Sequence, residues 1–144
     1  MAEAIGSILK SKGSTIHSVS PDATVYEAVH MMAAKEIGAV LVIEHGSLLG
    51  IISAKDYGTR VVLQGKNGKD VLAREVMTSP VVTAGPEVKI VDAMDILTTK
   101  KIRHLPIIDN GRLVGVVTLG DLVRAVLADK DHTIDQLMRY VGHK

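Results

Sequence analysis

The sequence contains no cysteine, tryptophan or phenylalanine, and its only aromatic side chains are three tyrosines. The absence of cysteine excludes disulfide bonds, thiolate metal sites and cysteine nucleophiles. The scarcity of aromatic side chains removes the stacking surfaces with which proteins commonly hold single-stranded nucleic acid. A core must therefore be built from aliphatic side chains and methionine.

The chain also lacks a strong charge of one sign and a long apolar run. Its 17 Lys and Arg and 16 Asp and Glu leave a formal charge of +1, and no basic run favours duplex binding through released counterions. The longest dense apolar stretch, residues 37–43, is far shorter than the ~20 residues of a membrane helix, and residues 1–12 lack the apolar segment of a signal peptide. We therefore expect a soluble, cytoplasmic protein with no nucleic-acid partner and no membrane insertion.

An internal repeat is the main positive feature of the sequence. Residues 16–61 align without a gap onto residues 81–126, and many aligned pairs keep a proline, a turn glycine or an aspartate. A length of 144 residues corresponds to one compact unit or two very small ones, and the 47% of hydrophobic residues supply enough apolar surface for a core. A copy of about 46 residues is too small to bury a sheet face alone, so we expect the two copies to pack together.

Each copy has the pattern of a β-α-β-β-α unit. A short apolar strand (residues 16–19 or 81–83) precedes a helix whose apolar residues recur at i, i+3, i+4 and i+7. Two aliphatic runs joined by a turn then predict a hairpin, and Asn110-Gly111 in the second copy is typical of a type I′ turn. A second helix is expected from about Lys55 or Gly120. The apolar residues of the first helices are Val25, Ala28, Val29 and Met32 in copy one and Ile90, Ala93, Met94 and Leu97 in copy two.

Further segments lie outside the two copies. Ile5, Ile8 and Leu9 suggest a short N-terminal helix that packs on the repeats. Near the C-terminus, Thr133 and Gln136 can cap a helix whose apolar stripe packs either on the chain's own core or against a second copy. The predicted order is an N-terminal extension (1–15), a first repeat (16–63), a linker (64–80), a second repeat (81–128) and a C-terminal helix (129–144).

The strongest site signal lies where each hairpin meets its second helix. Residues 50–56 read GIISAKD and residues 115–121 read GVVTLGD, which share a glycine, two aliphatic residues, a hydroxyl residue and an aspartate three positions later. This spacing is that of a capping box, which is a structural interpretation. The same residues suit nucleotide binding, because a helix N-terminus favours a phosphate and a carboxylate can accept hydrogen bonds from both hydroxyls of a ribose. The two interpretations are compatible.

The duplication, both motifs and the stretch EVMT at residues 75–78 together resemble a tandem pair of CBS domains, named after cystathionine β-synthase and also called a Bateman module. The resemblance covers residues 16–128 and implies an α+β fold (α/β in some schemes), with two pseudo-twofold-related repeats packed as one module. Known members bind adenosine compounds in two clefts. The resemblance implies that Asp56 and Asp121 hold the ribose, and that Ser53 and Thr118 are their hydroxyl partners. The candidates for the walls around the base are Ile16, Ser18, Ile37, Ala39, Thr83, Ile102 and Pro106.

The two copies carry cationic residues at different positions. Copy one has Lys55 and Arg60, copy two has Arg103 and His104, and neither pair has a cationic counterpart in the other copy. We interpret these residues as candidates for binding the phosphates of one or two ligands, with guanidinium groups giving paired contacts. Lys55 and Arg60 fit an exposed helix face as well. Because the cations differ, the two sites are expected to differ too, with AMP in one cleft while the other binds a longer ligand such as NAD or stays empty.

The prediction from the sequence is a regulatory module that binds an adenine nucleotide (AMP, ADP, ATP or NAD, with S-adenosylmethionine ranked after them). It would modulate a target enzyme or transporter, or its own association, and is expected to form a homodimer. The alternative is a constitutive protein-interaction module with vestigial clefts. No enzyme activity is expected, because G-x-S-x-G, G-x-G-x-x-G and paired catalytic carboxylates are missing, and no metal site is expected, because the histidines lack ligand spacing.

Overall fold

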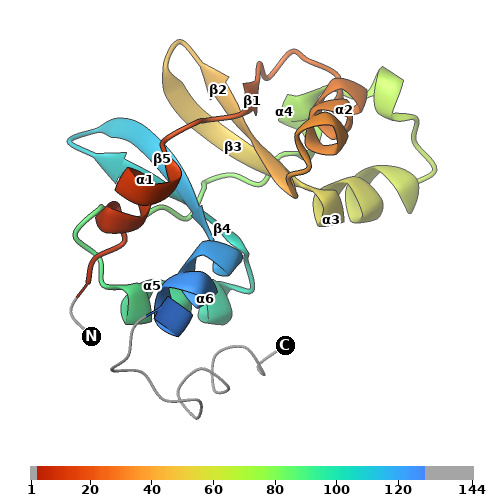
Figure 1. The fold of residues 1–144 in the computed structure, drawn as a ribbon. Coiled ribbons are helices and arrows are strands. Elements are labelled where there is room, and N and C mark those ends of the chain that lie inside the picture. Colours follow the sequence, from red (N-terminus) through yellow and green to blue (C-terminus); the bar gives the residue numbers. More distant parts are fainter. Residues whose placement is uncertain (1–2, 129–144) are drawn as a thin grey trace. The chain divides into compact units, whose positions relative to one another are not determined.

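The computed structural model describes residues 3–128, so the predicted C-terminal helix with Thr133 and Gln136 lies outside the described residues. The chain divides into two compact units (Figure 1). The first-repeat unit is Ile16–Val81, and the second-repeat unit combines Met1–Thr15 with Val82–Lys144. Both mix helices with a small sheet, so the predicted α+β fold class is confirmed.

The first-repeat unit is built around a three-stranded sheet in the order β1-β2-β3. β1 is parallel to β2, and β2 is antiparallel to β3. In chain order its elements are β1 (Ser18–Val19), α2 (Val25–Lys35), β2 (Ala39–Glu44), β3 (Ser47–Ser53), α3 (Ala54–Tyr57), the π-helical turn η1 (Gly58–Val62), the 3₁₀ turn η2 (Gly68–Asp70) and α4 (Ala73–Val76).

The second-repeat unit contains an antiparallel hairpin of β4 and β5. The N-terminal helix belongs to this unit and contacts β5. Its elements are α1 (Gly6–Lys12), α5 (Ile90–Lys100), β4 (His104–Asp109), β5 (Arg112–Thr118) and α6 (Leu119–Ala128).

The predicted apolar faces of α2 and α5 form the centre of the two cores. Three of the four predicted residues on α2 and all four on α5 are buried, and Val29 packs against the first core from a partly buried position. Thr24 accepts a hydrogen bond from the Glu27 backbone N–H at 3.1 Å, which is one half of a capping box at the start of α2. Both helices end at a residue in the left-handed region, Glu36 and Lys101. The sequence periodicity therefore identified the buried helix faces correctly.

Both hairpin turns have the predicted geometry. Asn110 and Gly111 have φ of 51° and 77°, as a type I′ turn requires, and His45 and Gly46 repeat these values closely at 51° and 79°. Each hairpin also shifts register once, between Val42 and Ile43 in the first unit and at the aligned place in the second. The duplication therefore extends to the irregularities of the backbone.

The expected first strand of the second repeat does not form among the described residues, where Ala84 makes a single isolated bridge with Ile107. In the first repeat, the Leu41 backbone N–H donates to the His17 carbonyl and supports the β1–β2 pairing. Pro106 stands at the position aligned with Leu41 and has no N–H to donate. The prediction of a strand at residues 81–83 is therefore wrong because one proline removes a ladder hydrogen bond.

The segments outside the two aligned copies are packed parts of the fold. Ile5 and Ile8 lie in the core of the second-repeat unit, as the predicted N-terminal helix requires. Residues 64–80, which we expected to be a linker, include α4 and contribute Val71, Ala73 and Val76 to the core of the first-repeat unit. Within the part of the chain that the structure describes, no helix is both long enough and apolar enough to cross a membrane.

Two glycine substitutions test the backbone geometry of this fold. Gly111→Ala should lower the free energy of unfolding by about 1 kcal/mol, because an L side chain at its φ of 77° is strained. Gly58→Ala should raise it by about 0.5–1 kcal/mol, because Gly58 is helical (φ −61°), nothing lies within 4 Å of an added Cβ, and the unfolded chain loses freedom. Urea denaturation of both variants measures the two shifts. Equal shifts of the same sign would contradict the turn or the helix assignment.

Candidate functional site

The first aspartate motif forms a reciprocal capping box at the start of α3. The Asp56 backbone N–H donates to Ser53 Oγ at 3.2 Å, and the Ser53 backbone N–H donates to Asp56 Oδ2 at 2.9 Å. The Ser53 hydroxyl also donates to Asp56 Oδ2 at 3.0 Å. Asp56 Oδ1 has weaker neighbours, with Thr78 Oγ1 at 3.4 Å and Arg60 Nε at 3.9 Å. One carboxylate oxygen is therefore fixed by the helix start, and the other keeps acceptor capacity.

The second motif repeats this box at the start of α6. The Asp121 backbone N–H donates to Thr118 Oγ1 at 3.1 Å, and the Thr118 backbone N–H donates to Asp121 Oδ2 at 2.8 Å. The structural interpretation of both motifs is thus confirmed. Both carboxylates have the same local geometry, since in each repeat the strand is followed directly by the helix without an intervening loop.

The glycine that opens each motif allows a close approach to the middle of a strand. Gly50 in β3 and Gly115 in β5 are both buried. A Cβ on Gly50 would collide with the Met77 side chain, and a Cβ on Gly115 would lie 2.8 Å from a methyl carbon of Leu9. The segments that come before the two repeats, α1 and the residues after α4, pack at these glycines.

Two cations that sequence reasoning missed bind the Asp121 carboxylate. Lys12 Nζ donates to Oδ2 at 2.7 Å, and an Arg124 guanidinium nitrogen donates to Oδ1 at 2.8 Å. Arg124 lies three residues after Asp121 on α6, a helical spacing that could have indicated the pair. Lys12 lies on α1, far away in the sequence, and no local pattern points to it.

The partners of Asp121 decide its protonation state. Only 8% of the Asp121 side chain is exposed, and this burial by itself raises the pKa. The hydrogen bonds from Lys12 and the Thr118 N–H, together with the Lys12 charge, outweigh burial and hold the pKa below its ordinary value of 3.8. The carboxylate is therefore charged at neutral pH.

His104 begins β4 and lies directly opposite Thr118 in the hairpin. Burial lowers the pKa of His104 from its ordinary value of 6.5, and the positive charges of Lys12 and Arg103 lower it further, whereas Asp121 raises it. The expectation that His104 is a cation for phosphate is therefore not supported at neutral pH, where the ring is uncharged. Arg103 is exposed, and its carbonyl accepts from the Leu119 N–H at the start of α6.

The predicted cations of the first repeat differ in their surroundings. Lys55 is exposed on α3. The Arg60 guanidinium donates to the carbonyls of Val76 and Met77 at 2.8 and 3.1 Å, so part of its hydrogen-bonding capacity ties η1 to the end of α4. The interpretation of Lys55 as part of an exposed helix face agrees with its position.

Sheet register brings two of the residues predicted to surround a base to the first motif. Ala39 pairs with Ser53 across β2 and β3, and Ile16 lies at the level of Ala39 when the β1–β2 register is continued. Ser18 pairs with Leu41 further along β2. In the second-repeat unit, Pro106 is buried, Ile102 is half-buried and Thr83 is exposed. Ile37, two residues after the end of α2, is half-buried beside the first core.

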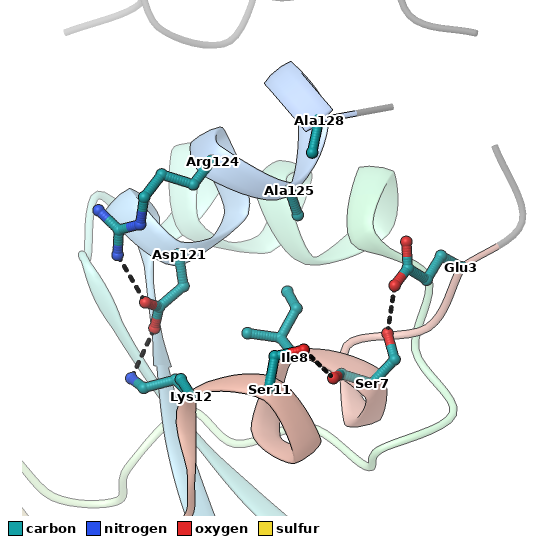
Figure 2. Close-up of a pocket in the computed structure, with 9 residues that line it drawn as sticks. All are labelled: Glu3, Ser7, Ile8, Ser11, Lys12, Asp121, Arg124, Ala125 and Ala128. Atoms are coloured by element: carbon teal, nitrogen blue, oxygen red, sulfur yellow. Dashed lines mark hydrogen bonds and ion pairs between the residues drawn. The ribbon is translucent and has the colours of Figure 1, made fainter. Parts of the chain in front are cut away.

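A pocket of about 700 Å³ lies in the second-repeat unit beside Asp121, and its lining by residues of the N-terminal segment was not expected from the sequence (Figure 2). Asp121, Lys12 and Arg124 form one end of it, where the two cations reach different oxygens of the carboxylate. The residues that line the pocket are Glu3, Ser7, Ile8, Ser11, Lys12, Asp121, Arg124, Ala125 and Ala128, from α1, α6 and the residues before α1. Among residues 3–128, no group of three or more His, Asp or Glu side chains could hold a metal ion.

Comparison with known proteins identifies similar chains. The family model of the CBS domain matches residues 12–57 and 73–128. The mitochondrial CBS domain-containing protein CBSX3 of Arabidopsis thaliana is 34% identical over 95% of this chain and 71% of its own length. The CBS domain-containing protein YhcV of Bacillus subtilis is 35% identical over 82% of this chain and 84% of its own length. The crystal structure of a CBS-domain protein from Agrobacterium tumefaciens superposes with a TM-score of 0.81 at 33% identity, covering 85% of this chain and 98% of that one.

The lowered pKa of His104 predicts a pH dependence of stability. The unfolded chain binds a proton at this ring more readily than the folded chain, so the free energy of unfolding should fall as the pH drops through about 6.5. His104→Gln should remove this contribution and flatten the slope between about pH 7.5 and 5.5. The measurement is urea denaturation at stepped pH, with His30→Gln, an exposed histidine on α2, as the matched control. An unchanged slope in His104→Gln would show that the ring does not carry this effect.

Proposed function

Because the chain belongs to the CBS-domain family and contains two copies of the domain, we propose that it is a regulatory module that binds an adenine nucleotide through Asp56 and Asp121. The ligands proposed are AMP, ADP, ATP or NAD. Each aspartate would accept hydrogen bonds from the two hydroxyls of the ribose.

The observation that carries this proposal is the open oxygen of Asp56. Oδ2 already accepts two hydrogen bonds from Ser53, which hold the carboxylate in one orientation, whereas Oδ1 has only contacts at 3.4 and 3.9 Å. A carboxylate offers about four lone-pair positions, so the two hydroxyls of a ribose can still be accommodated. Because the capping box already fixes the Asp56 side chain, ligand binding does not have to reduce its conformational entropy further.

The surroundings of Asp56 also suit a nucleoside. Ala39 and Ser53 are half-buried neighbours in the sheet, and Ile16 and Ile37 are half-buried apolar residues of the same unit. Apolar side chains beside a few fixed polar groups are typical of small-molecule sites. An adenine base would cover these apolar groups while the carboxylate holds the sugar.

Removal of the carboxylate charge tests this assignment. Asp56→Asn should weaken nucleotide binding at the first site at least tenfold, because each hydrogen bond to a charged group contributes about 1.5–3 kcal/mol. Isothermal titration calorimetry with AMP, ADP, ATP and NAD measures the change. Asp95→Asn, which removes the charge of an exposed aspartate on α5, is the matched control and should bind like the wild type. No heat of binding from any of these ligands to the wild-type protein would refute the proposal.

We also propose that the regulatory module forms a homodimer through exposed apolar side chains of η1 and α6. Val62 and Leu127 occupy aligned positions of the two repeats, and 53% and 66% of these side chains are exposed. Leu63, next to Val62, is 77% exposed. Large apolar side chains exposed at equivalent positions of both repeats favour burial against a second copy.

Charged side chains at these positions should therefore weaken self-association. Sedimentation velocity of Val62→Lys combined with Leu127→Lys should show a shift toward monomer, whereas Thr59→Lys, at another exposed position of η1, should leave the association state unchanged. Identical sedimentation of the double variant and the wild type would contradict this interface.

A further inference from the structure

The two aspartates that we propose to hold ribose differ in the number of hydrogen bonds that they already accept. At Asp121, Oδ2 accepts from the Thr118 N–H and from Lys12, and Oδ1 accepts from Arg124 at 2.8 Å. Three of about four lone-pair positions are therefore in use, all of them in short, charge-assisted or backbone hydrogen bonds. At Asp56, the two short hydrogen bonds to the carboxylate are both accepted by Oδ2, and their donors are the backbone N–H and the hydroxyl of Ser53.

The two cations on Asp121 are not equally easy to displace. Arg124 has 72% of its side chain exposed, and its guanidinium has no further hydrogen bond among the described residues. A ribose hydroxyl can therefore replace Arg124 more readily than Lys12, because water can solvate the released guanidinium group at its exposed position. Lys12 is only 37% exposed and also donates to the Val116 carbonyl at 3.1 Å.

The position of Lys12 is set by buried residues of α1. Ile5 and Ile8 anchor this helix in the core of the second-repeat unit, and Lys12 is its last residue. Gly13 follows with φ of 92°, where the chain leaves the helix. The ammonium group is therefore presented to Asp121 by a packed helix end and is not a freely moving surface charge.

We infer that Lys12 is a specificity-determining residue of the second site, because it competes with the ribose hydroxyls for Asp121 Oδ2 and makes this site the weaker of the two. The inference rests on the proposed function. Binding of ribose to both oxygens of Asp121 requires the end of α1 to release its ion pair, whereas binding at Asp56 requires no such step. In this way the N-terminal segment controls occupancy of the second repeat.

An NMR titration of the full chain with adenosine reads the two sites separately. The Ser53 amide donates to Asp56 and the Thr118 amide donates to Asp121, so their signals report the first and the second carboxylate. Adenosine has a ribose and no phosphate, so removal of a lysine does not remove an attraction to the ligand's charge. In the wild type, the Ser53 signal should reach its midpoint at a lower adenosine concentration than the Thr118 signal.

Lys12→Met should shift the Thr118 midpoint to an adenosine concentration about tenfold lower and leave the Ser53 midpoint unchanged, because one charged hydrogen bond no longer has to be broken. Lys10→Met is the matched control, since it removes the same charge from an exposed position of the same helix and should move neither midpoint. Melting curves verify that both variants are folded. If Lys12→Met does not fold, Lys12→Gln, which keeps a donor for the Val116 carbonyl, takes its place.

The possible results separate this inference from the function on which it rests. If the Ser53 signal responds to adenosine but the Thr118 midpoint is equal or higher in the Lys12 variant than in the wild type, competition by Lys12 is disproved and the nucleotide proposal stands. If neither signal responds in any of the proteins, the ribose assignment itself fails, and the inference falls with it.

Discussion

The hydrogen-bonded box between a hydroxyl residue and the aspartate three positions later fixes the junction of hairpin and helix in each repeat. It joins β3 to α3 and β5 to α6 without a connecting loop, and it satisfies backbone N–H groups that the first turn of a helix leaves free. The same bonds orient the carboxylates of Asp56 and Asp121. The bonds that cap the helix thus also fix the orientation of the carboxylate for which we propose ribose binding.

The two repeats retain this box but have diverged around it. Pro106 replaces Leu41 and removes the hydrogen bond that supports a first strand, so the second-repeat unit keeps one bridge where the first-repeat unit has β1. Arg124 and Lys12 approach Asp121, whereas the nearest cation to Asp56 is Arg60 at 3.9 Å. The two repeats therefore share the backbone structure around the aspartate, whereas differences in the surrounding residues give the two carboxylates different electrostatic environments.

The segments before the repeats are part of this difference. The residues after α4 approach Gly50 of the first repeat, and α1 approaches Gly115 of the second, at glycines that a Cβ would obstruct. Near Asp56 the approaching segment brings the neutral hydroxyl of Thr78, whereas near Asp121 it brings the ammonium of Lys12. The chemistry near each aspartate therefore depends on residues that lie outside its own repeat copy.

The sequence by itself determined the duplication, the buried faces of α2 and α5, both hairpins and both capping boxes. All of these depend on short-range periodicity, turn chemistry or i,i+3 spacing, which are properties of neighbouring residues. Only the tertiary structure decided that Lys12 binds Asp121, that Arg60 binds the end of α4, and that His104 is held uncharged by burial and nearby cations. These contacts join distant segments, and their strength depends on burial, so no local pattern in the chain encodes them.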